Sequence, residues 1–253
     1  MKEKISIFFD AVWSNDISYS QFREYSAIQN EVFGIDYTGE KFSKKFLCNI
    51  YGDSLFVFAK VDQLCVGAMV FWRNDIYTLK AYQPCEMAVV NKYRGYGIFP
   101  RMNAKGLEFI GDDCLFYNFP NDNSLPSYMK MGWFVHSKQR YKIFNPFADA
   151  KDIPKIDEGY LDWLLGDANI KNIEYLGCFV FNKKYYLIQQ KKWCVYIVIA
   201  EVSEKNSRKL KRVNLPFLLH YSSRGYMGRG VVRVTNIQNG DIDIPLYKIG
   251  PLF

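Results

Sequence analysis

The spacing of hydrophobic residues predicts two long helices in the first half of the chain. Residues 19–33 place apolar side chains at helical spacing, and Gly34 follows, which predicts an amphipathic helix that ends at this glycine. Residues 98–110 show the same period, and Pro100 is acceptable because it would lie in the first helical turn. A short additional helix is expected over residues 39–47.

Runs rich in valine and phenylalanine predict strands around these helices. Two of them, residues 54–61 and 65–72, flank the short segment VDQL and indicate an antiparallel hairpin. Further strands are expected at residues 85–90, 114–119 and 133–144, with a short helix at residues 124–131. The order of hairpin, strand, helix, strand, helix and strand indicates a mixed α/β layer.

A proline-bearing connection, residues 145–154, interrupts the pattern and predicts a domain boundary. We therefore expect two domains: residues 1–148, and a smaller α/β domain or sheet extension over residues 149–253. In the second part, strands are expected at residues 176–181, 185–189, 195–202 and 231–234, and a helix interrupted at Pro216 over residues 208–221.

Composition narrows the class of protein. With 253 residues, of which 49% are hydrophobic, the chain can bury a proper core and should fold as a soluble protein. Its net charge of +7 favours acidic partners, among them nucleotide phosphates, anionic lipid and nucleic acid. The basic group at residues 205–212 is expected to be a solvated loop or helix face.

The cysteines and the apolar runs favour a cytoplasmic protein. The six cysteines have no close pairing and sit mostly in apolar runs, so reduced core thiols are expected rather than disulfides or a zinc site. The first 16 residues lack the features of a secretory signal. The apolar run at residues 193–200 is far shorter than the ~20 residues that cross a bilayer, so no membrane span is expected.

A glycine turn at residues 93–99, YRGYGIF, falls between a predicted strand and a predicted helix. Gly95 and Gly97 let the backbone approach an anion closely, and the helix dipole adds to the attraction. Lys92 and Arg94 supply positive charge for a pyrophosphate or a ribose phosphate. The turn alone fits a tight structural corner equally well, because it lacks the Gly-Lys-Ser/Thr ending of a P-loop and the third glycine of the dinucleotide fingerprint.

A second motif, residues 121–133 (NDNSLPSYMKMGW), follows the turn after one helix and one strand. Together with residues 87–99, MAVVNKYRGYGIF, it resembles the acyl-carrier site of the GNAT superfamily of acetyltransferases. The residues that match the superfamily's Asn, small residue, Tyr, Lys, Gly and aromatic at the same spacing are Asn121, Ser124, Tyr128, Lys130, Gly132 and Trp133. The resemblance covers about the first 150 residues, and residues 119–124, FPNDNS, are similar to a bacterial branch found in surface-polysaccharide pathways.

The resemblance implies a fold and a binding mode. The fold would be a mixed, mostly antiparallel sheet flanked by helices, with a smaller C-terminal α/β extension or half-GNAT-like domain that helps to form the acceptor site. The arm of the acyl carrier would lie between two splayed strands, against the backbone of Met87, Ala88 and Val89, and the N–H of Val89 would polarise the thioester carbonyl. The residues that would hold the pyrophosphate are Lys92, Tyr93, Arg94, Gly95, Tyr96, Gly97 and Ile98. Asn121 and Ser124 would bind the arm or organise the second helix.

Two residues are predicted to move protons. Tyr128 lies where the superfamily commonly protonates the departing thiolate, and a phenol near its normal pKa suits donation; a core tyrosine is the alternative. Glu86 is the leading candidate for general base, although alternation along a strand places it and Met87 on opposite faces, and a surface or ion-paired carboxylate is the alternative. His136 and His220 are weaker candidates, and neither has a metal-ligand spacing, so no metal is expected.

The predicted function is acyl-CoA-dependent N-acyl transfer. Acetyl-CoA would be the co-substrate, and a primary amine would attack the thioester directly. The resemblance favours an amino sugar as the acceptor, either nucleotide-linked or a polysaccharide precursor. The alternatives are a catalytically inactive GNAT-like binding or assembly module and, ranked lower, nucleic-acid binding through the positive charge. The sequence is compatible with an oligomer and does not define the acyl-chain length.

A second glycine-rich segment, residues 223–230 (SRGYMGRG), is similar to a phosphate turn. The strand-like run VVRVTNI follows it, so the helix N-terminus of an anion site is missing. A basic hairpin loop is therefore expected. Contact with an acidic acceptor and a faint duplication of the first fold are the alternatives.

Overall fold

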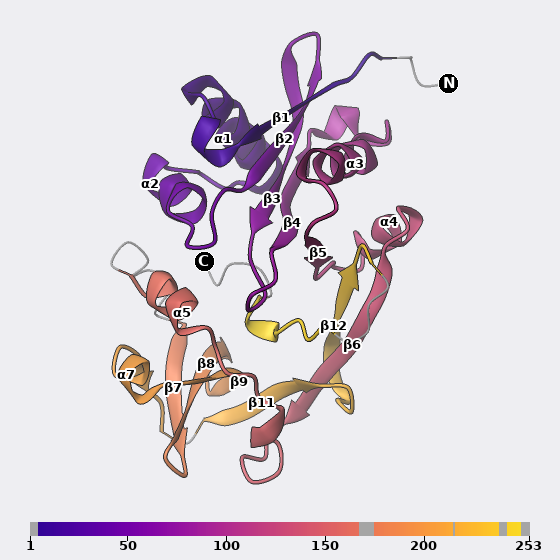
Figure 1. Cartoon of the computed structure of the whole chain (residues 1–253). Coiled ribbons are helices and arrows are strands. Elements are labelled where there is room, and N and C mark those ends of the chain that lie inside the picture. The colour runs from indigo at the N-terminus through magenta and orange to yellow at the C-terminus, as the bar shows by residue number, and fades with distance from the viewer. Residues whose placement is uncertain (1–4, 167–174, 215, 238–241, 249–253) are drawn as a thin grey trace. The chain divides into compact units, whose positions relative to one another are not determined.

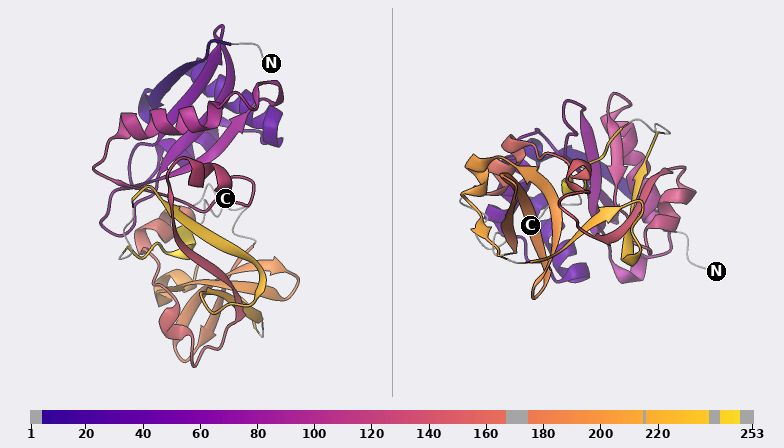
Figure 2. Two further views of the ribbon diagram at one scale, coloured as in Figure 1. Left: turned by 90° about the vertical axis from the view of Figure 1, so that its right-hand side faces the viewer. Right: turned by 90° about the horizontal axis from the view of Figure 1, so that it is seen from below.

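The computed structural model describes residues 5–166, 175–214, 216–237 and 242–248, and its contacts divide the chain into two compact units (Figure 1, Figure 2). Unit 1 comprises Met1–Asn118, Pro126–Trp133 and Thr235–Ile237, and unit 2 comprises Phe119–Leu125, Phe134–Val234 and Gln238–Phe253. The predicted domains 1–148 and 149–253 stay a prediction. The two units differ from them, because residues 119–125 and 134–148 belong to unit 2 and residues 235–237 belong to unit 1.

Unit 1 is built on five strands. In sheet order they are β1 (Phe8–Trp13), β2 (Leu55–Val61), β3 (Leu64–Arg73), β4 (Ala81–Val89) and β5 (Leu115–Asn118); the first four pair antiparallel, and β5 runs parallel to β4. Nearly every residue of β2 is buried, which requires cover on both faces of the sheet. Figures 1 and 2 show α1 (Tyr19–Phe33) and α2 (Gly39–Phe42) on one face and α3 (Ile98–Ile110) on the other.

Local sequence determines how the two long helices end and pack. Ser18 caps α1 and exchanges hydrogen bonds with Gln21, and Gly34 ends the helix with a φ of 67°, which glycine adopts without strain. α3 packs closely on β3 because Gly106 has no side chain: a Cβ there would lie 1.9 Å from the ring of Phe71. Both helices begin and end where the spacing predicts.

Unit 2 contains a second set of strands. In sheet order they are β12 (Met227–Thr235), β6 (Phe134–Ile143), β11 (Phe217–Ser222), β9 (Val195–Val202), β8 (Lys184–Lys192), β7 (Leu176–Phe181) and β10 (Lys211–Arg212). β7, β8 and β9 form an antiparallel meander, whereas β11 runs parallel to β9 and antiparallel to β6. The short helices α5 (Glu158–Leu164) and α7 (Glu204–Ser207) also belong to this unit. Its core contains Phe144, Ile153, Tyr186, Ile188, Val198 and Leu218.

Most predicted elements are confirmed to within a few residues, including α4 (Leu125–Lys130), and the fold is the mixed, mostly antiparallel α/β arrangement that was expected. The helix predicted over residues 208–221 is wrong, because residues 217–222 form β11. Leu218 and His220 are buried and their neighbours are more exposed, which is the alternation of a strand. Both edges of this segment pair with strands distant in sequence. The prediction also missed β1, the first half of β4, and α5.

Three chemical features complete the description. Within the described residues, no helix has the length and hydrophobicity needed to cross a membrane. In the same part of the chain, no three His, Cys, Asp or Glu side chains are grouped closely enough to hold a metal ion. All six cysteines are free; Cys114 and Cys178 are buried, as expected of core thiols, whereas Cys48 and Cys194 are exposed.

Candidate functional site

The strands β4 and β5 pair only at their first residues. The parallel ladder joins Ala81 to Leu115 and Tyr82 to Phe116. Beyond Tyr82, none of the strands in the described part of the chain pairs with this edge of β4. The edge from this point to Val89 therefore offers backbone groups with which an extended ligand can form hydrogen bonds.

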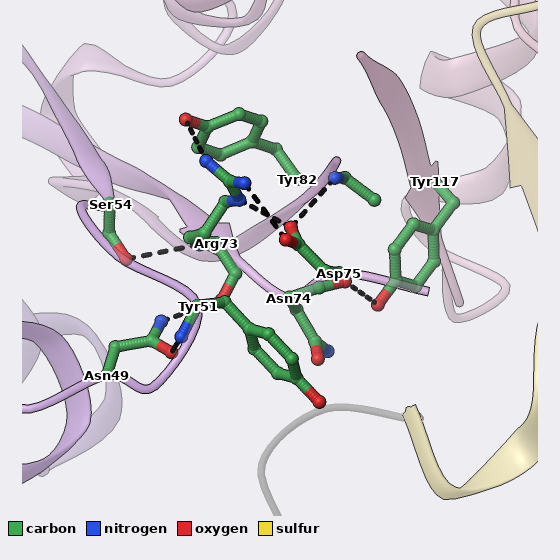
Figure 3. Close-up of polar contacts among 9 residues, drawn as sticks. Asn49, Tyr51, Ser54, Arg73, Asn74, Asp75, Tyr82 and Tyr117 are labelled. Atoms are coloured by element: carbon green, nitrogen blue, oxygen red, sulfur yellow. Dashed lines mark hydrogen bonds and ion pairs between the residues drawn. The ribbon is translucent and has the colours of Figure 1, made fainter. Parts of the chain in front are cut away.

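A polar cluster holds the paired end of the two strands together (Figure 3). The guanidinium of Arg73 forms an ion pair with Asp75, whose carboxylate also accepts a hydrogen bond from the backbone N–H of Ala81 at 3.0 Å. Tyr117 of β5 donates to the carbonyl of Asn74 at 3.0 Å. These contacts fix the β3–β4 turn against β5, so the separation of β4 from β5 begins at a defined point.

A β-bulge lies in the middle of the open edge. Two residues of β4, Glu86 and Met87, oppose the single residue Met69 of β3. Glu86 has a φ of 49°, a left-handed conformation that costs free energy in any residue with a side chain. Such a conformation persists only where neighbouring residues hold the backbone in place, and the contacts of Glu86 provide this support.

Glu86, the predicted general base, is enclosed by side chains from α1 and from the segment after it. Its carboxylate accepts hydrogen bonds from Tyr25 and Tyr37 and forms an ion pair with Lys45. Gln29 donates to the backbone carbonyl of Glu86 at 2.7 Å. Burial alone would raise the pKa of Glu86, but the charge of Lys45 and the three hydrogen bonds hold it below its usual range. A carboxylate with a lowered pKa accepts a proton less readily, and the role of base stays a prediction.

The register of β3 and β4 gives the direction of the Val89 N–H. The N–H of Val90 donates to the carbonyl of Val66 at 3.0 Å, so these two residues form a hydrogen-bonded pair. Hydrogen-bonded and non-hydrogen-bonded pairs alternate in an antiparallel ladder, so the next pair, Gly67 with Val89, is of the second kind. The N–H of Val89 therefore points away from β3, toward the open edge. On that same edge, the Val89 carbonyl accepts from Nε of Arg94 at 3.0 Å.

The glycine turn connects this edge to α3. Gly95 and Gly97 have φ values of 81° and 72°, which favour glycine. Gly97 is the N-cap of α3; it has no side chain to accept from the first helical N–H groups, and the position that a Cβ would take is open. Those N–H groups remain free to bind an anion. Lys92 is exposed beside the turn, with its ammonium 4.9 Å from the ring centroid of Tyr93.

Tyr128 lies on α4 against two aromatic side chains, with ring centroids 5.6 Å from Phe99 and 4.8 Å from Trp133. Its hydroxyl oxygen accepts a hydrogen bond from the side-chain amide of Asn118 at 2.5 Å. Burial raises the pKa of Tyr128 well above its usual value, so the phenol stays protonated at neutral pH. Because the oxygen is the acceptor in the bond with Asn118, the phenolic proton is left for donation.

Asn121 and Ser124 form the turn that precedes α4. The side-chain oxygen of Asn121 accepts from the backbone N–H groups of Asn123 and Ser124, both at 3.0 Å, and from the hydroxyl of Ser124 at 3.1 Å. The N–H of Leu125 donates to the Asn121 carbonyl at 2.9 Å. These bonds correspond to the second role expected of the two residues, which is to organise the helix.

The two histidines lie in unit 2. His136 is half-buried on β6. His220 is buried on β11 with its Nε2 atom 3.3 Å from a carboxylate oxygen of Asp149, and burial lowers its pKa. A buried imidazole of this kind is typical of a structural residue.

The structure places the predicted residues of β4 and of the glycine turn in one continuous segment. Ala88 and Ile98 are buried, so only their backbone groups are offered to a ligand. Sequence reasoning missed the side chains that contact Glu86 and Tyr128. One signal was present: Tyr25 and Gln29 lie four residues apart on α1 and are fully buried, and buried polar groups require partners.

Solved structures with a similar fold include two acyltransferase-type proteins. A conserved protein of unknown function from Enterococcus faecalis V583, described as a probable N-acyltransferase, is 11% identical, with 91% of this chain and 72% of that chain covered and a TM-score of 0.53. A GCN5-related N-acetyltransferase from Kribbella flavida is 10% identical, with 90% and 71% covered and a TM-score of 0.50. No protein-family model and no curated protein sequence matches the chain. At these identities the likeness shows the fold alone, and that fold is GNAT-like.

Proposed function

We propose that the chain is an acyl-CoA-dependent N-acyltransferase that transfers an acetyl group from acetyl-CoA to a primary amine in a ternary complex. The observation that carries the proposal is the open edge of β4, which continues directly into the two-glycine turn and the uncapped N-terminus of α3. An acyl carrier has the matching parts in the matching order. Its amide-bearing arm can pair with a strand edge, and its pyrophosphate suits the N–H groups of a helix N-terminus.

The N–H of Val89 would stabilise the negative charge that develops on the thioester oxygen when the amine attacks. The β3–β4 ladder holds this strand on one side, and Arg94 holds the Val89 carbonyl, so the donor is oriented before the reaction begins. As the C–N bond forms and the C–S bond breaks, the phenol of Tyr128 would protonate the departing sulfur. The proton released by the amine passes to a base or to water.

Glu86 has two roles in this proposal that an experiment can separate. As a general base it would take the amine proton, directly or through water. As a partner of Lys45 it would hold the bulge of β4 in place. Loss of the base should lower kcat and leave the affinity for acetyl-CoA unchanged, whereas loss of the bulge should weaken both the affinity and the stability. Glu86→Gln, studied by steady-state kinetics and by calorimetry, distinguishes the two.

A catalytically inactive GNAT-like binding module is the second candidate function. One observation favours it: the predicted base is already engaged by Lys45, Tyr25 and Tyr37. This candidate predicts that acetyl-CoA binds but that no amine is acetylated. An amino sugar, nucleotide-linked or part of a polysaccharide precursor, is the acceptor that the sequence resemblance favours. Mass spectrometry of products from a panel of amines that includes amino sugars tests both points.

Titration calorimetry with acetyl-CoA tests the binding half of the proposal. Gly95→Glu places a carboxylate in the turn and should weaken binding at least about tenfold, because it repels the pyrophosphate and strains a left-handed residue. Gly39→Glu is the matched control, since it adds the same charge to unit 1 at a glycine with open space around it. Absence of acetyl-CoA binding by the wild type, or equal binding by Gly95→Glu, would contradict the proposal.

A further inference from the structure

A cleft of about 470 Å³ lies within unit 2, which is in the size range of small-molecule sites. Its walls are Lys138, Gln139 and Arg140 of β6 and the glycine-rich segment that begins at Ser223 and continues to Val232. Among the described residues that line it, two are valines and none is aromatic. This lining suits a compact polar ligand better than a nucleobase or a lipid chain, since those ligands are usually held by aromatic or broadly apolar surfaces.

The glycines of this segment are explained by close packing of its backbone against β6. A Cβ at Gly225 would lie 2.1 Å from the carbonyl oxygen of Arg140, and one at Gly230 would lie 2.7 Å from the carbonyl oxygen of Gln139. Gly228 has a φ of 65°, which again favours glycine. Where these glycines lie, the wall of the cleft is therefore formed by backbone. The charged side chains of β6 then determine which ligand the cleft attracts.

Two cations of β6 are available to such a ligand. Lys138 and Arg140 are two residues apart on one strand, so their side chains point to the same face, and both are exposed. In the described part of the chain, neither side chain forms an ion pair or a hydrogen bond. Asp122 is the acidic residue of the lining and already has an interaction of its own.

Arg233 of β12, next to Val232 in the wall, is a buried cation that forms no ion pair with the described residues. Arg233 is 6% exposed and donates to the hydroxyl of Ser137 at 2.8 Å and to the side-chain oxygen of Gln139 at 3.2 Å. Its Nε atom is buried and has no hydrogen-bond partner, and the negative charge of Asp243 attracts the guanidinium without forming an ion pair with it. These contacts place Arg233 on the face of β6 that Ser137 and Gln139 share, opposite to the face of Lys138 and Arg140, so Arg233 takes no part in holding a ligand there.

We propose that this cleft binds a phosphate-bearing small molecule. Arg140 can contact two phosphate oxygens at once through its planar guanidinium, and Lys138 adds a compact second charge. The residues of this site belong to unit 2, whereas β4, the glycine turn and Tyr128 belong to unit 1, and the test of this site does not require transferase activity.

Titration calorimetry with inorganic pyrophosphate on the full chain tests the proposal. The protein is first saturated with CoA, so that the glycine turn of unit 1 does not compete for the probe. One saturable site is expected in the wild type, and Lys138→Ala/Arg140→Ala should weaken it at least about tenfold. Lys191→Ala/Lys192→Ala is the matched control: it removes the same charge from exposed residues at the β8–β9 turn of unit 2 and should bind as the wild type does.

Three results would overturn the proposal. The first is the absence of saturable pyrophosphate binding by the wild type. The second is an equal loss in the two double variants, which would show a general effect of charge. The third is binding of a single-stranded oligonucleotide that depends on Lys138 and Arg140 while pyrophosphate does not bind, which would assign the surface to nucleic acid. Circular dichroism of each variant establishes that the fold is kept.

Discussion

The two units of the chain hold electrical charge in different ways. Unit 1 contains 14 lysines and arginines and 14 aspartates and glutamates, whereas unit 2 contains 19 and 12, so unit 2 carries the whole net charge of +7. Two buried cations, Lys45 of unit 1 and Arg233 of unit 2, are also held differently. In unit 1, Lys45 and Glu86 form an ion pair, and two tyrosines complete the hydrogen bonds of the carboxylate. In unit 2, Arg233 forms no ion pair among the described residues and is attracted only at longer range by Asp243, although the buried carboxylate of Asp149 is paired with Lys142 in the same unit.

This difference separates two ways of attracting an anion. The site proposed in unit 1 relies on N–H groups fixed by a strand edge and by a helix N-terminus, so a unit without net charge can bind a multiply charged carrier. The site proposed in unit 2 relies on charged side chains at the surface. Salt screens exposed charges strongly, so added salt should weaken pyrophosphate binding to unit 2 more than acetyl-CoA binding to unit 1.

The largest effect is expected from breaking the buried pair of unit 1. Lys45→Met leaves the Glu86 carboxylate buried without its cation, so the free energy of unfolding should fall by about 3–5 kcal/mol. Urea denaturation measures this change. The double variant Lys45→Met/Glu86→Gln removes both charges and should recover most of the loss. A Lys45→Met protein as stable as the wild type would show that the pair contributes nothing to the stability of unit 1.

The next effect concerns chemistry and not stability. Tyr128→Phe removes the proposed proton donor, so kcat should fall about 100-fold while the affinity for acetyl-CoA stays unchanged. Steady-state kinetics and calorimetry provide the two values. Tyr186→Phe is the matched control, because Tyr186 is also fully buried and belongs to unit 2. If the two variants had the same kcat, Tyr128 would be a core tyrosine and not an acid.

A smaller effect is expected at the N-terminus of α3. Gly97→Val strains a residue with a φ of 72° and fills the open space before the helix, so the affinity for acetyl-CoA should fall about tenfold and the stability by about 1–2 kcal/mol. Gly111→Val is the control, because Gly111 ends the same helix with a φ of 83°. Gly111→Val should lower the free energy of unfolding by a similar amount and leave the affinity for acetyl-CoA unchanged. Equal losses of affinity would mean that backbone strain alone, and not the open helix terminus, governs binding.

The dependence of stability on pH gives a fourth prediction. The pKa of Glu86 is lower in the folded protein than its value of about 4.3 in an unfolded chain. The carboxylate therefore contributes stability that is complete above the unfolded value and is lost as the pH falls through the folded value. Between pH 5 and pH 3, the wild type should lose more free energy of unfolding than Lys45→Met/Glu86→Gln does. If the free energy of unfolding fell equally with pH in the two proteins, the pKa of Glu86 would not be lowered by folding.

Local patterns were sufficient to predict the two long helices, the second half of β4 and the glycine turn of unit 1, but not the first half of β4, where this strand pairs with β5. α1 and α3 have the predicted ends, because a hydrophobic period and a terminal glycine are properties of the segment itself. The order of strand, glycine turn and helix could be predicted for the same reason. β11 could not, because its strand conformation depends on pairing with β6 and β9, which lie far away in the sequence.

The surroundings of the predicted residues were beyond the reach of local patterns. Glu86 was predicted as a base from its place on the strand, but the side chains that lower its pKa come from residues 41 to 61 positions away. The direction of the Val89 N–H depends on the register with β3, which a bulge shifts by one residue. A motif thus identified which residues form the candidate site, and tertiary contacts determine which of their atoms are free to act.

The smallest effect is expected from the buried cation of unit 2. Arg233→Met removes a charge that forms no ion pair among the described residues, and the carboxylate that attracts it, Asp243, is exposed to water, so the free energy of unfolding should change by no more than about 1 kcal/mol. Ser137 and Gln139 lose a donor, but both are partly exposed and water can replace it. Urea denaturation of Arg233→Met and of Lys45→Met compares a buried cation that has no ion pair with one that has. If both variants lost about 3–5 kcal/mol, Arg233 would have a counter-ion in solution, and the contrast between the two units would fail.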